Sequence, residues 1–524
     1  MARSLGICCI LLSMCAGGAR AAGGGDPPKH WIYFTDKGFA DGAAQSAAIE
    51  ALADTYSARA IERRRLRRTA PGLFDSRDLP VAAAYRARVE GAGARIDVAS
   101  RWLNAVSVEA DSEALHEIRA LPFVARVEPV RVGRRIEPGP VSPADEPGAA
   151  RSFYGYATEQ LTQINLPELH ARGYTGAGVV IGILDTGFLR VHEAFNHHDN
   201  PLPVVAEWDF IDRDGDTSYE QGDPPDQHVH GTLILGTIRA YKPDELVGGA
   251  YDASVILCKT EDVTSETPVE EAYYVAGLEF IEANGGDMAT SSLGYIDWYT
   301  QDDMDGQTAT TTIAVNVATE NGVHCCTAAG NQGNDGDPAT SHLVAPGDAL
   351  EVITCGAVSG EGTLVGFSSD GPTADGRVKP EVLAQGADTY TVWPFDTTGY
   401  SQASGTSLST PLVASAVACI VQARPWWTPE ILREHLFDTA SDFAQFGWPD
   451  PLFARGYGIV DADRAAGEYC YVDLDGSGGV NTMDLLIFLN RWAARDDLAD
   501  FNADGVIDTR DVLAYLNAWS SGCP

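Results

Sequence analysis

Residues 151–468 alternate short apolar runs with segments of helical periodicity. The run at 179–184 is entirely apolar, as expected for a strand that is buried on both faces of a parallel sheet. Similar runs follow at 254–258, 323–329 and 350–358, and helical patterns lie between them near 269–283 and 308–321. This alternation predicts an α/β domain of three layers with a mostly parallel sheet, whose functional groups collect at the carboxyl ends of the strands.

The first part of the chain has a different pattern, typical of a small α+β domain over residues 22–135. Residues 105–108 alternate like a strand, and 123–127 read as another. Between them, Asp111 can cap a helix whose apolar side chains recur on one face as far as Leu121.

Two further segments complete the organisation. Residues 136–150 are rich in Pro, Ala and Gly, so we expect an exposed linker that is open to proteolysis. Residues 469–524 contain an internal repeat with a spacing of 27 residues. Its first copy, Asp484, Leu486, Leu489, Asn490 and Trp492, returns as Asp511, Leu513, Leu516, Asn517 and Trp519, which indicates a duplicated all-α unit.

Charge divides the chain in the same way. The 524 residues carry a formal net charge of −38, and their number alone favours two or more domains. The first 150 residues hold 20 basic and 18 acidic side chains, including a basic run at 62–68, so the negative excess lies in the remainder. A protein that holds DNA or RNA by bulk electrostatics is therefore excluded, and neutral or basic substrates are favoured over acidic ones.

The N-terminus is predicted to be a signal peptide over residues 1–21. Arg3 supplies its positive charge, 5–15 form an apolar stretch too short to span a bilayer, and Ala19-Arg20-Ala21 fits a cleavage site. A lipoprotein signal ending at Cys15 is the alternative, although Met14 fits it poorly. No later segment has 18 consecutive apolar residues, so we expect no membrane span and a secreted or cell-surface protein.

Four motifs carry the chemistry, and they follow one another in the order Asp, His, Asn, Ser. They lie at 183–187 (Ile-Leu-Asp-Thr-Gly), 230–232 (His-Gly-Thr), 328–331 (Ala-Ala-Gly-Asn) and 405–411 (Gly-Thr-Ser-Leu-Ser-Thr-Pro). A serine hydroxyl needs a histidine as general base, and an acid must orient that histidine. An amide donor can then stabilise the oxyanion formed on a substrate carbonyl.

These motifs closely resemble those of the subtilase family of serine endopeptidases over about 155–465. The resemblance implies that Asp185 orients His230, that His230 is the general base, that Ser407 is the nucleophile and that Asn331 is the oxyanion donor, with no cofactor for catalysis. It also implies that 292–294 form a substrate-binding edge strand that pairs with an extended peptide. The residues expected to line the substrate site are Ser292, Leu293, Gly294, Ala328, Ala329 and Gly330.

Residues 22–135 resemble the propeptide of the same family, which acts as a folding template and inhibitor and is then removed. The likeness rests on Ser100 to Asn104 and Val124 to Pro129, and the linker at 136–150 is the expected cleavage region. The resemblance therefore implies a zymogen whose peptidase domain spans 151–468 and whose substrates are proteins or peptides.

Other interpretations remain open from the sequence. A catalytically silent scaffold could keep the fold and attach through its C-terminal unit. Asp226, His228 and His230 could hold a metal, although no further ligand set accompanies them. An acidic loop could bind Ca²⁺ or simply be solvated, with Asp212, Asp214 and Asp216 as its alternating carboxylates.

The C-terminal repeat has the spacing of two calcium loops, and it resembles a dockerin domain. Ligands are expected at loop positions 1, 3, 5, 9 and 12, with glycine at position 6. They are Asp473, Asp475, Ser477, Asn481 and Asp484 in the first loop and Asp500, Asn502, Asp504, Asp508 and Asp511 in the second. The unit is then either a Ca²⁺-folded appendage or a docking module for a cohesin-like receptor.

Cysteine usage fits an oxidising compartment. Cys470 and Cys523 bracket the last module and are a candidate disulfide. The five cysteines between residues 258 and 419 sit in apolar runs, where free cysteine behaves as a small apolar side chain.

Overall fold

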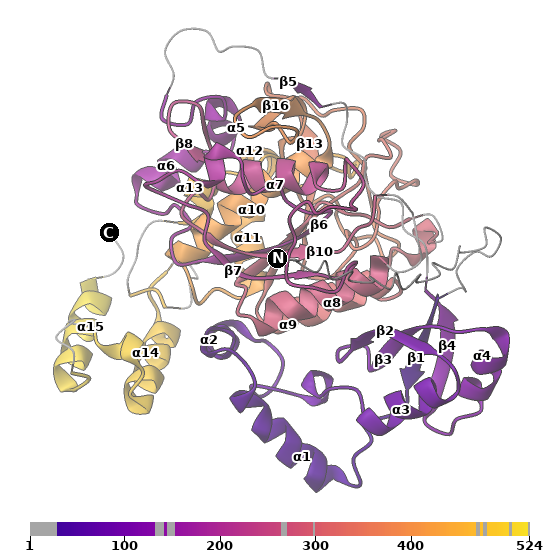
Figure 1. Ribbon diagram of the computed structural model, residues 1–524. Coiled ribbons are helices and arrows are strands. Elements are labelled where there is room, and N and C mark those ends of the chain that lie inside the picture. The colour runs from indigo at the N-terminus through magenta and orange to yellow at the C-terminus, as the bar shows by residue number, and fades with distance from the viewer. Residues whose placement is uncertain are drawn as a thin grey trace, which may run out of the picture.

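A parallel sheet of seven strands forms the centre of the protein (Figure 1). The computed structural model describes residues 29–130, 141–143, 152–263, 270–296, 299–467, 472–474, 479–501 and 506–521. The strands lie in the order β14-β13-β12-β11-β6-β10-β7, and every neighbouring pair is parallel. Their bounds are β6 (Val180–Asp185), β7 (Val204–Asp209), β10 (Ser254–Lys259), β11 (Met288–Ser291), β12 (His324–Ala328), β13 (Ile353–Val358) and β14 (Val382–Gln385).

Helices cover both faces of the sheet, which confirms the predicted three layers. Alternate residues of β6 point to opposite faces, so Ile181 and Ile183 join one apolar core and Val180 and Leu184 join the other. The first core includes α7 (Val229–Arg239), α10 (Thr406–Ala423) and α11 (Pro429–Thr439). The second includes α8 (Glu270–Ala283) and α9 (Thr310–Glu320).

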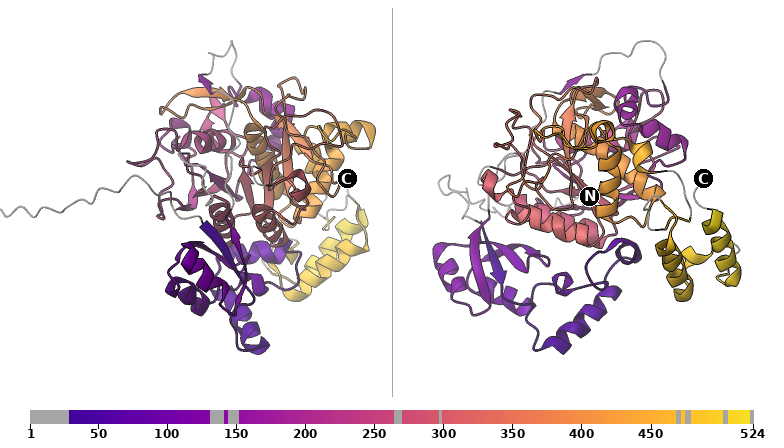
Figure 2. Two further views of the ribbon diagram at one scale, coloured as in Figure 1. Left: turned by 90° about the vertical axis from the view of Figure 1, so that its right-hand side faces the viewer. Right: turned by 180° about the vertical axis from the view of Figure 1, so that it is seen from behind.

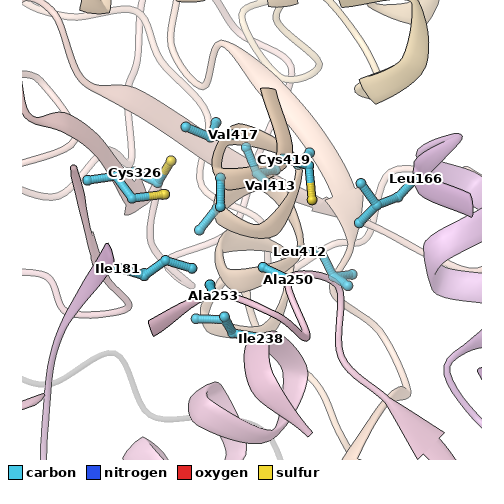
Figure 3. Packing of buried hydrophobic residues seen from close by; sticks show 14 of the residues in the cluster. Leu166, Ile181, Ile238, Ala250, Ala253, Cys326, Leu412, Val413, Val417 and Cys419 are labelled. Carbon is cyan, nitrogen blue, oxygen red and sulfur yellow. The ribbon is translucent and has the colours of Figure 1, made fainter. Parts of the chain in front are cut away.

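Helix α10 lies in the middle of the first core. Figure 3 shows Leu412, Val413 and Val417 of α10 between Ile181 of β6 and Leu166 of α6 (Leu166–Ala171). By length and composition α10 is the one helix among the described residues that could cross a membrane, but 94% of it is buried inside the fold. Its apolar character is thus accounted for by packing within this domain.

Smaller elements complete the domain built on the seven-stranded sheet. They are β5 (Ser142–Pro143), α5 (Thr158–Gln163), η3 (Glu193–Phe195), β8 (Tyr241–Lys242), β9 (Leu246–Val247), η4 (Gln301–Asp303), β15 (Thr389–Val392), β16 (Tyr400–Ala403), α12 (Ser441–Phe446) and α13 (Ala462–Ala465). The short strands β15, β16 and β5 form a separate antiparallel sheet.

The N-terminal domain is an antiparallel sheet of four strands in the order β2-β3-β1-β4, as expected for a small α+β unit. Its strands are β1 (Lys29–Phe34), β2 (Arg95–Ser100), β3 (Ala105–Glu109) and β4 (Val124–Pro129), and it carries α3 (Ala83–Gly91) and α4 (Ser112–Arg119). Asp111 caps α4 by accepting from the amide of Ala114, as the sequence predicts.

Between β1 and α3 the chain makes a helical excursion. It consists of α1 (Gly42–Glu50), η1 (Ala51–Asp54), α2 (Ala58–Arg67) and η2 (Ser76–Asp78). We call residues 41–78 the helical insertion. Figures 1 and 2 show this domain, in indigo and purple, beneath the layer of α8 and α9. Trp102 lies at this contact and belongs to the same apolar core as residues of α8.

The C-terminal unit contains α14 (Thr482–Ala494), η5 (Asp497–Ala499) and α15 (Thr509–Ser521). Phe488 stacks on Tyr515 with ring centroids 4.1 Å apart. The repeated tryptophans bridge the two copies reciprocally, because Trp492 Nε1 donates to the carbonyl of Asp508 and Trp519 Nε1 donates to that of Asn481, each over 2.8 Å. The predicted duplication is therefore seen as a near-symmetric pair of helices.

Candidate active site

Asp185 is the last residue of β6 and lies fully buried at the carboxyl edge of the sheet. Its Oδ1 accepts a hydrogen bond of 2.7 Å from the amide of Thr186. The strand register places Leu184 opposite Ser291, and Ser291 opposite Thr327. The strands β6, β11 and β12 therefore end side by side, and the motif residues that follow them lie close together at the carboxyl edge.

His230 is the second residue of α7, and its Nδ1 lies 2.8 Å from Asp185 Oδ1. A carboxylate at this distance favours the tautomer with the proton on Nδ1 and leaves the Nε2 lone pair available. Among the described residues, Nε2 is buried without a hydrogen-bond partner. An imidazole held in this way can accept a proton from a nearby hydroxyl.

Gly231 explains how α7 comes so close to β6. A Cβ at this position would lie 2.3 Å from the carbonyl oxygen of Gly187, a distance that no side chain tolerates. The amide of Gly231 also donates to Thr186 Oγ1 over 3.2 Å. Glycine after the histidine is thus a requirement of the close approach.

Ser407 is the second residue of α10 and is fully buried. Its Oγ donates to the carbonyl of Ser292 over 3.4 Å, and Ser292 Oγ donates to the carbonyl of Ser407 over 2.9 Å. Within the described chain, no hydrogen bond joins Ser407 to His230. Such bonds are often long before substrate binds, so the arrangement remains compatible with proton transfer.

Asn331 follows Gly330 in the loop after β12. Its Oδ1 accepts from both the amide and the hydroxyl of Thr406, each over 2.9 Å. Two donors on the oxygen assign the other end of the side chain as the NH₂ group, which is the donor an oxyanion hole needs. A Cβ on Gly330 would lie 2.7 Å from Ser369 Oγ, so this loop also depends on a glycine, whose φ is +120°.

The expected substrate-binding residues flank this site. Residues 292–294 follow directly after β11, and Ala328 to Gly330 follow the same edge of β12. Residues 292–294 lie outside the regular strands of the described structure, whereas the sequence predicts an edge strand there. Pairing resumes at Tyr295, whose amide donates to the carbonyl of Ala345 over 2.9 Å.

Three further residues at this edge were not identified from the sequence. Glu261 follows β10, is 2% exposed and accepts from the hydroxyl of Tyr295 over 2.7 Å. Burial and the Glu261 carboxylate raise the pKa of Tyr295 well above its usual value. Gln227 Nε2 donates to the carbonyls of Thr186 and Glu261, each over 2.6 Å. An acidic residue two positions after the end of an apolar strand, Glu261, is the signal that could have located this group.

The structure separates the residues of the two metal sites that the sequence suggested near β6 and β7. His228 Nε2 contacts the carbonyl of Pro394 at 2.9 Å while His230 binds Asp185, so the two imidazoles face different partners. The Asp216 carboxylate accepts from Ser218 and Arg190 and lies outside the carboxylate cluster of Asp214, although the Asp216 amide donates to Asp214 Oδ1 over 2.9 Å.

Asp214 instead gathers with Asp209 and Glu220, whose carboxylates lie within 4.8 Å of one another. This cluster borders a pocket of about 570 Å³. The ammonium of Lys259 already lies 2.7 Å from Asp209, so the carboxylates have a cation among their neighbours.

The described part of the C-terminal loops is ordered around two buried carboxylates at position 12. Asp484 accepts from the amides of Leu474 and Asn481 over 2.7 and 2.8 Å, and Asp511 accepts from the amide of Asp508 over 2.8 Å. Asp473, Asn481, Asp500 and Asp508 are also described. The other predicted ligands, Asp475, Ser477, Asn502 and Asp504, lie outside the described residues, as do Cys470, Cys523, the signal peptide and most of the linker.

The five remaining cysteines are free and buried, as the sequence predicts: Cys258, Cys325, Cys326, Cys355 and Cys419. Burial raises the pKa of the Cys325 thiol to about 12, so it stays neutral at physiological pH.

Comparison with known proteins gives two family matches and many relatives. Residues 176–459 match the model of the Subtilase family, and 29–140 match that of the Peptidase S8 propeptide domain, Bacteroidota. Subtilisin E of Bacillus subtilis (strain 168) is 28% identical over 375 residues, covering 71% of this chain and 84% of that protein. Subtilisin DY of Bacillus licheniformis is 30% identical over 306 residues, covering 58% and 96%.

The fold has a counterpart among solved structures. Fervidolysin from Fervidobacterium pennivorans, described as a keratinolytic enzyme related to subtilisin, superposes with a TM-score of 0.60 at 20% identity. The match covers 86% of this chain, which spans 62% of the fervidolysin chain, and it shows the shared fold. Together with the family match over more than half of the sequence, these relatives show that the chain belongs to the subtilase family, as a serine-type endopeptidase with a propeptide of that family.

Proposed function

We propose that this chain is a secreted zymogen whose peptidase domain hydrolyses peptide bonds with Asp185, His230 and Ser407. The observation that carries the proposal is the contact of 2.8 Å between His230 Nδ1 and Asp185 Oδ1 at the carboxyl edge of the sheet. Ser407 lies at the start of α10, beside Ser292 on that same edge.

Each residue has a defined step. Ser407 Oγ attacks the carbonyl carbon of the scissile bond, and its proton passes to His230 Nε2. The carbonyl oxygen takes the negative charge and is stabilised by the Asn331 amide and by the positive partial charge at the N-terminus of α10. The leaving amine takes the proton from His230. Water then attacks the acyl-enzyme with His230 again as base, and Ser407 is restored.

Substrate is expected to be an extended peptide, because residues 292–294 and 328–330 lie at the carboxyl ends of the adjacent strands β11 and β12. The acidic surface of the peptidase domain disfavours acidic peptides. We assign 22–135 to the propeptide, 136–150 to the processing region, 151–468 to the peptidase and 469–524 to the C-terminal module.

The test compares the wild-type protein with Ser407→Ala by intact mass and by casein hydrolysis. We expect the wild type to lose roughly its first 135–150 residues, as the linker position implies, and to cleave casein. The variant should keep its propeptide and be inert. The matched control is Ser409→Ala on the same helix, whose hydroxyl donates to the carbonyl of Thr406 over 3.0 Å.

If wild type and Ser407→Ala behave alike, Ser407 is not the nucleophile. The alternative, a catalytically silent binding protein, then gains support. An organophosphonate separates the two directly, since it labels Ser407 only where the hydroxyl is activated.

We further propose that the C-terminal module is dockerin-like, binds Ca²⁺ structurally and docks to a cohesin-like receptor. Its oxygen donors are of the type Ca²⁺ prefers, and the buried Asp484 and Asp511 stand at the twelfth position of each loop. Leu486 and Leu513 occupy equivalent positions of the repeat and are 51% and 62% exposed, which supports a docking surface. Calorimetry with an isolated cohesin domain, with and without Ca²⁺, tests both parts.

A further inference from the structure

The segment 365–370, between β13 and β14, lies beside the loop that carries Asn331. The amide of Ser369 donates to the carbonyl of Gly330 over 2.9 Å, and Ser369 Oγ accepts from the amide of Gln332 over 3.0 Å. The residues on either side of Asn331 are therefore bound to one serine.

Asp370 holds the rest of this loop, which runs from residue 330 to 342 and which we call the Asn331 loop. The side chain of Asp370 is fully buried. Its Oδ1 lies 2.6 Å from His342 Nδ1, and its Oδ2 accepts from the amide of Asp335 over 3.2 Å. The backbone carbonyl of Asp370 also accepts from the amide of His342 over 3.0 Å. One residue thus binds both the middle and the end of the loop.

The contact between Asp370 and His342 assigns the imidazole proton. A carboxylate accepts hydrogen bonds, so Nδ1 is the donor. Among the described residues, no lysine or arginine forms an ion pair with Asp370. A buried carboxylate without such a cation depends on its hydrogen-bond donors to compensate for the lost water. The loop is therefore held by contacts that are costly to break.

Asn331 needs both its side chain and its backbone fixed. Thr406 binds the oxygen of the Asn331 side chain and so sets the direction of the NH₂ group. The position of that group also depends on the backbone of the loop, which Ser369 and Asp370 hold. An oxyanion donor acts only within hydrogen-bond distance of the developing charge, and a shift of about 1 Å can lower the rate about 10²-fold.

We propose that Asp370, through His342 and the amide of Asp335, is a positioning residue for the oxyanion donor Asn331. It acts on the loop rather than on the substrate. It holds the Asn331 loop so that the NH₂ group lies where the negative charge develops. The inference rests on the role of Asn331 in the proposed function.

The test measures kcat and KM for peptide hydrolysis by variants of the full chain. Each variant carries a recognition sequence for an added protease in the linker, so that maturation does not depend on its own activity. Asp370→Ala removes both acceptor oxygens from the Asp335 amide and from His342 Nδ1. We expect kcat to fall at least about tenfold and KM to change less than about twofold, because the displaced donor acts in the transition state.

The matched control is Asp337→Ala in the same loop. Asp337 is exposed, and its carboxylate accepts from the amide of Ala339 over 3.0 Å. Its removal should change kcat less than about twofold, since an exposed group loses little when water replaces its partner. If Asp370→Ala and Asp337→Ala have equal kcat values, Asp370 is not a positioning residue.

Two variants of His342 guard against a general loss of folding. His342→Asn keeps a donor, since the amide nitrogen of asparagine, like Nδ1, lies two bonds from Cβ. His342→Leu removes the donor and leaves Asp370 Oδ1 buried without it. We expect His342→Asn to keep kcat within about threefold of the parent and His342→Leu to lower it at least about tenfold. Equal kcat values for the two variants would refute a role for this hydrogen bond.

A double-variant cycle separates positioning from a purely structural role. If Asp370 acts through Asn331, adding Asp370→Ala to Asn331→Ala should lower kcat less than about twofold further. A loss by the same factor in both backgrounds would overturn the proposal.

The same measurements distinguish failure of this inference from failure of the proposed function. If Asn331→Ala keeps the parent kcat, Asn331 is not the oxyanion donor, and the positioning role of Asp370 is refuted with it. If Asn331→Ala lowers kcat but Asp370→Ala does not, the oxyanion role stands and only the inference about Asp370 is wrong.

Discussion

The central sheet buries charged groups in opposite ways at the amino ends of its strands, called the amino edge here, and at their carboxyl ends, the carboxyl edge. At the amino edge, both oxygens of Asp287 are occupied, by Arg67 on one and by Arg59 and the Val180 amide on the other. At the carboxyl edge, Asp185 Oδ2 and His230 Nε2 are buried and have no hydrogen-bond partner among the described residues. A carboxylate whose two oxygens are both paired holds two surfaces together, whereas an unpaired carboxylate oxygen and an unpaired imidazole nitrogen stay available to reacting groups.

The largest effect is expected from changing the tautomer at the carboxyl edge. Asp185→Asn keeps the shape of the side chain but no longer requires the proton on His230 Nδ1. We expect kcat to fall about 10⁴-fold, as for triads of this kind. The measurement is peptide hydrolysis after maturation by an added protease. Asp212→Asn, at an exposed acid, is the control, and a loss below tenfold would separate Asp185 from the chemistry.

A smaller loss should follow from removing only the oxyanion donor. Asn331→Asp keeps an oxygen that can accept from Thr406 but replaces the NH₂ group by a second oxygen. We expect kcat to fall by about 10²–10³ with little change in KM, because the donor acts in the transition state. A variant that raised KM at constant kcat would instead place Asn331 in ground-state binding.

The sequence predicts the carboxyl edge better than the amino edge, and the reason is physical. Strands buried on both faces are continuous apolar runs, and the motif residues follow them directly, so Asp185 and Asn331 can be placed by reading along the chain. The extended pairing expected at 292–294 is less local, and the structure has no regular strand there. The conformation of residues 292–294 depends on the pairing of Tyr295 with Ala345, which lies much later in the sequence.

The docking of α2 has no local signature at all. The arginines are visible as a basic run, but Arg63 and its partner Glu282 are 219 residues apart. A basic run is also typical of a solvated helix face, and Arg65 shows that part of this one is exposed. Only the fold reveals which arginines are buried.

Lowering the pH should weaken the contact between the N-terminal domain and the amino edge, with a smaller effect than the two substitutions above. The pKa of Glu282 is lowered from 4.5 to about 2 in the intact chain, against the effect of burial, by the arginines around it. Binding energy from this pair is therefore fully present above pH 4.5 and is lost as the pH falls towards 2. In a Ser407→Ala chain that an added protease has cut between residues 144 and 150, we expect the N-terminal domain to bind with constant affinity from pH 7 to 5. From pH 4.5 to 2.5 this affinity should fall more than about tenfold.

Glu282→Gln removes this titration and should flatten the curve between pH 4.5 and 2.5, apart from a residual slope due to Asp287. Propeptide release that already begins near pH 6 in the parent complex would contradict the assignment. It would point to a histidine as the controlling group.

The smallest effect on activity is expected from removing Ca²⁺, because the C-terminal module has an apolar core of its own, separate from the central sheet. Among the described residues, its apolar cluster around Phe488 and Tyr515 consists of residues of the module itself. Chelation should alter the fluorescence of Trp492 and Trp519, whose indole groups bond the ninth position of each loop, while kcat/KM changes less than about twofold. Asp484→Ala with Asp511→Ala should reproduce the fluorescence change without chelator.

If chelation abolishes activity in that double variant as well, the activity depends on a cation bound elsewhere. The cluster of Asp209, Asp214 and Glu220 beside β7 is then the candidate site. The carboxyl ends of the strands would then need a metal for their order, and the contrast between a reactive site without a metal and the paired carboxylates at the amino ends would have to be revised.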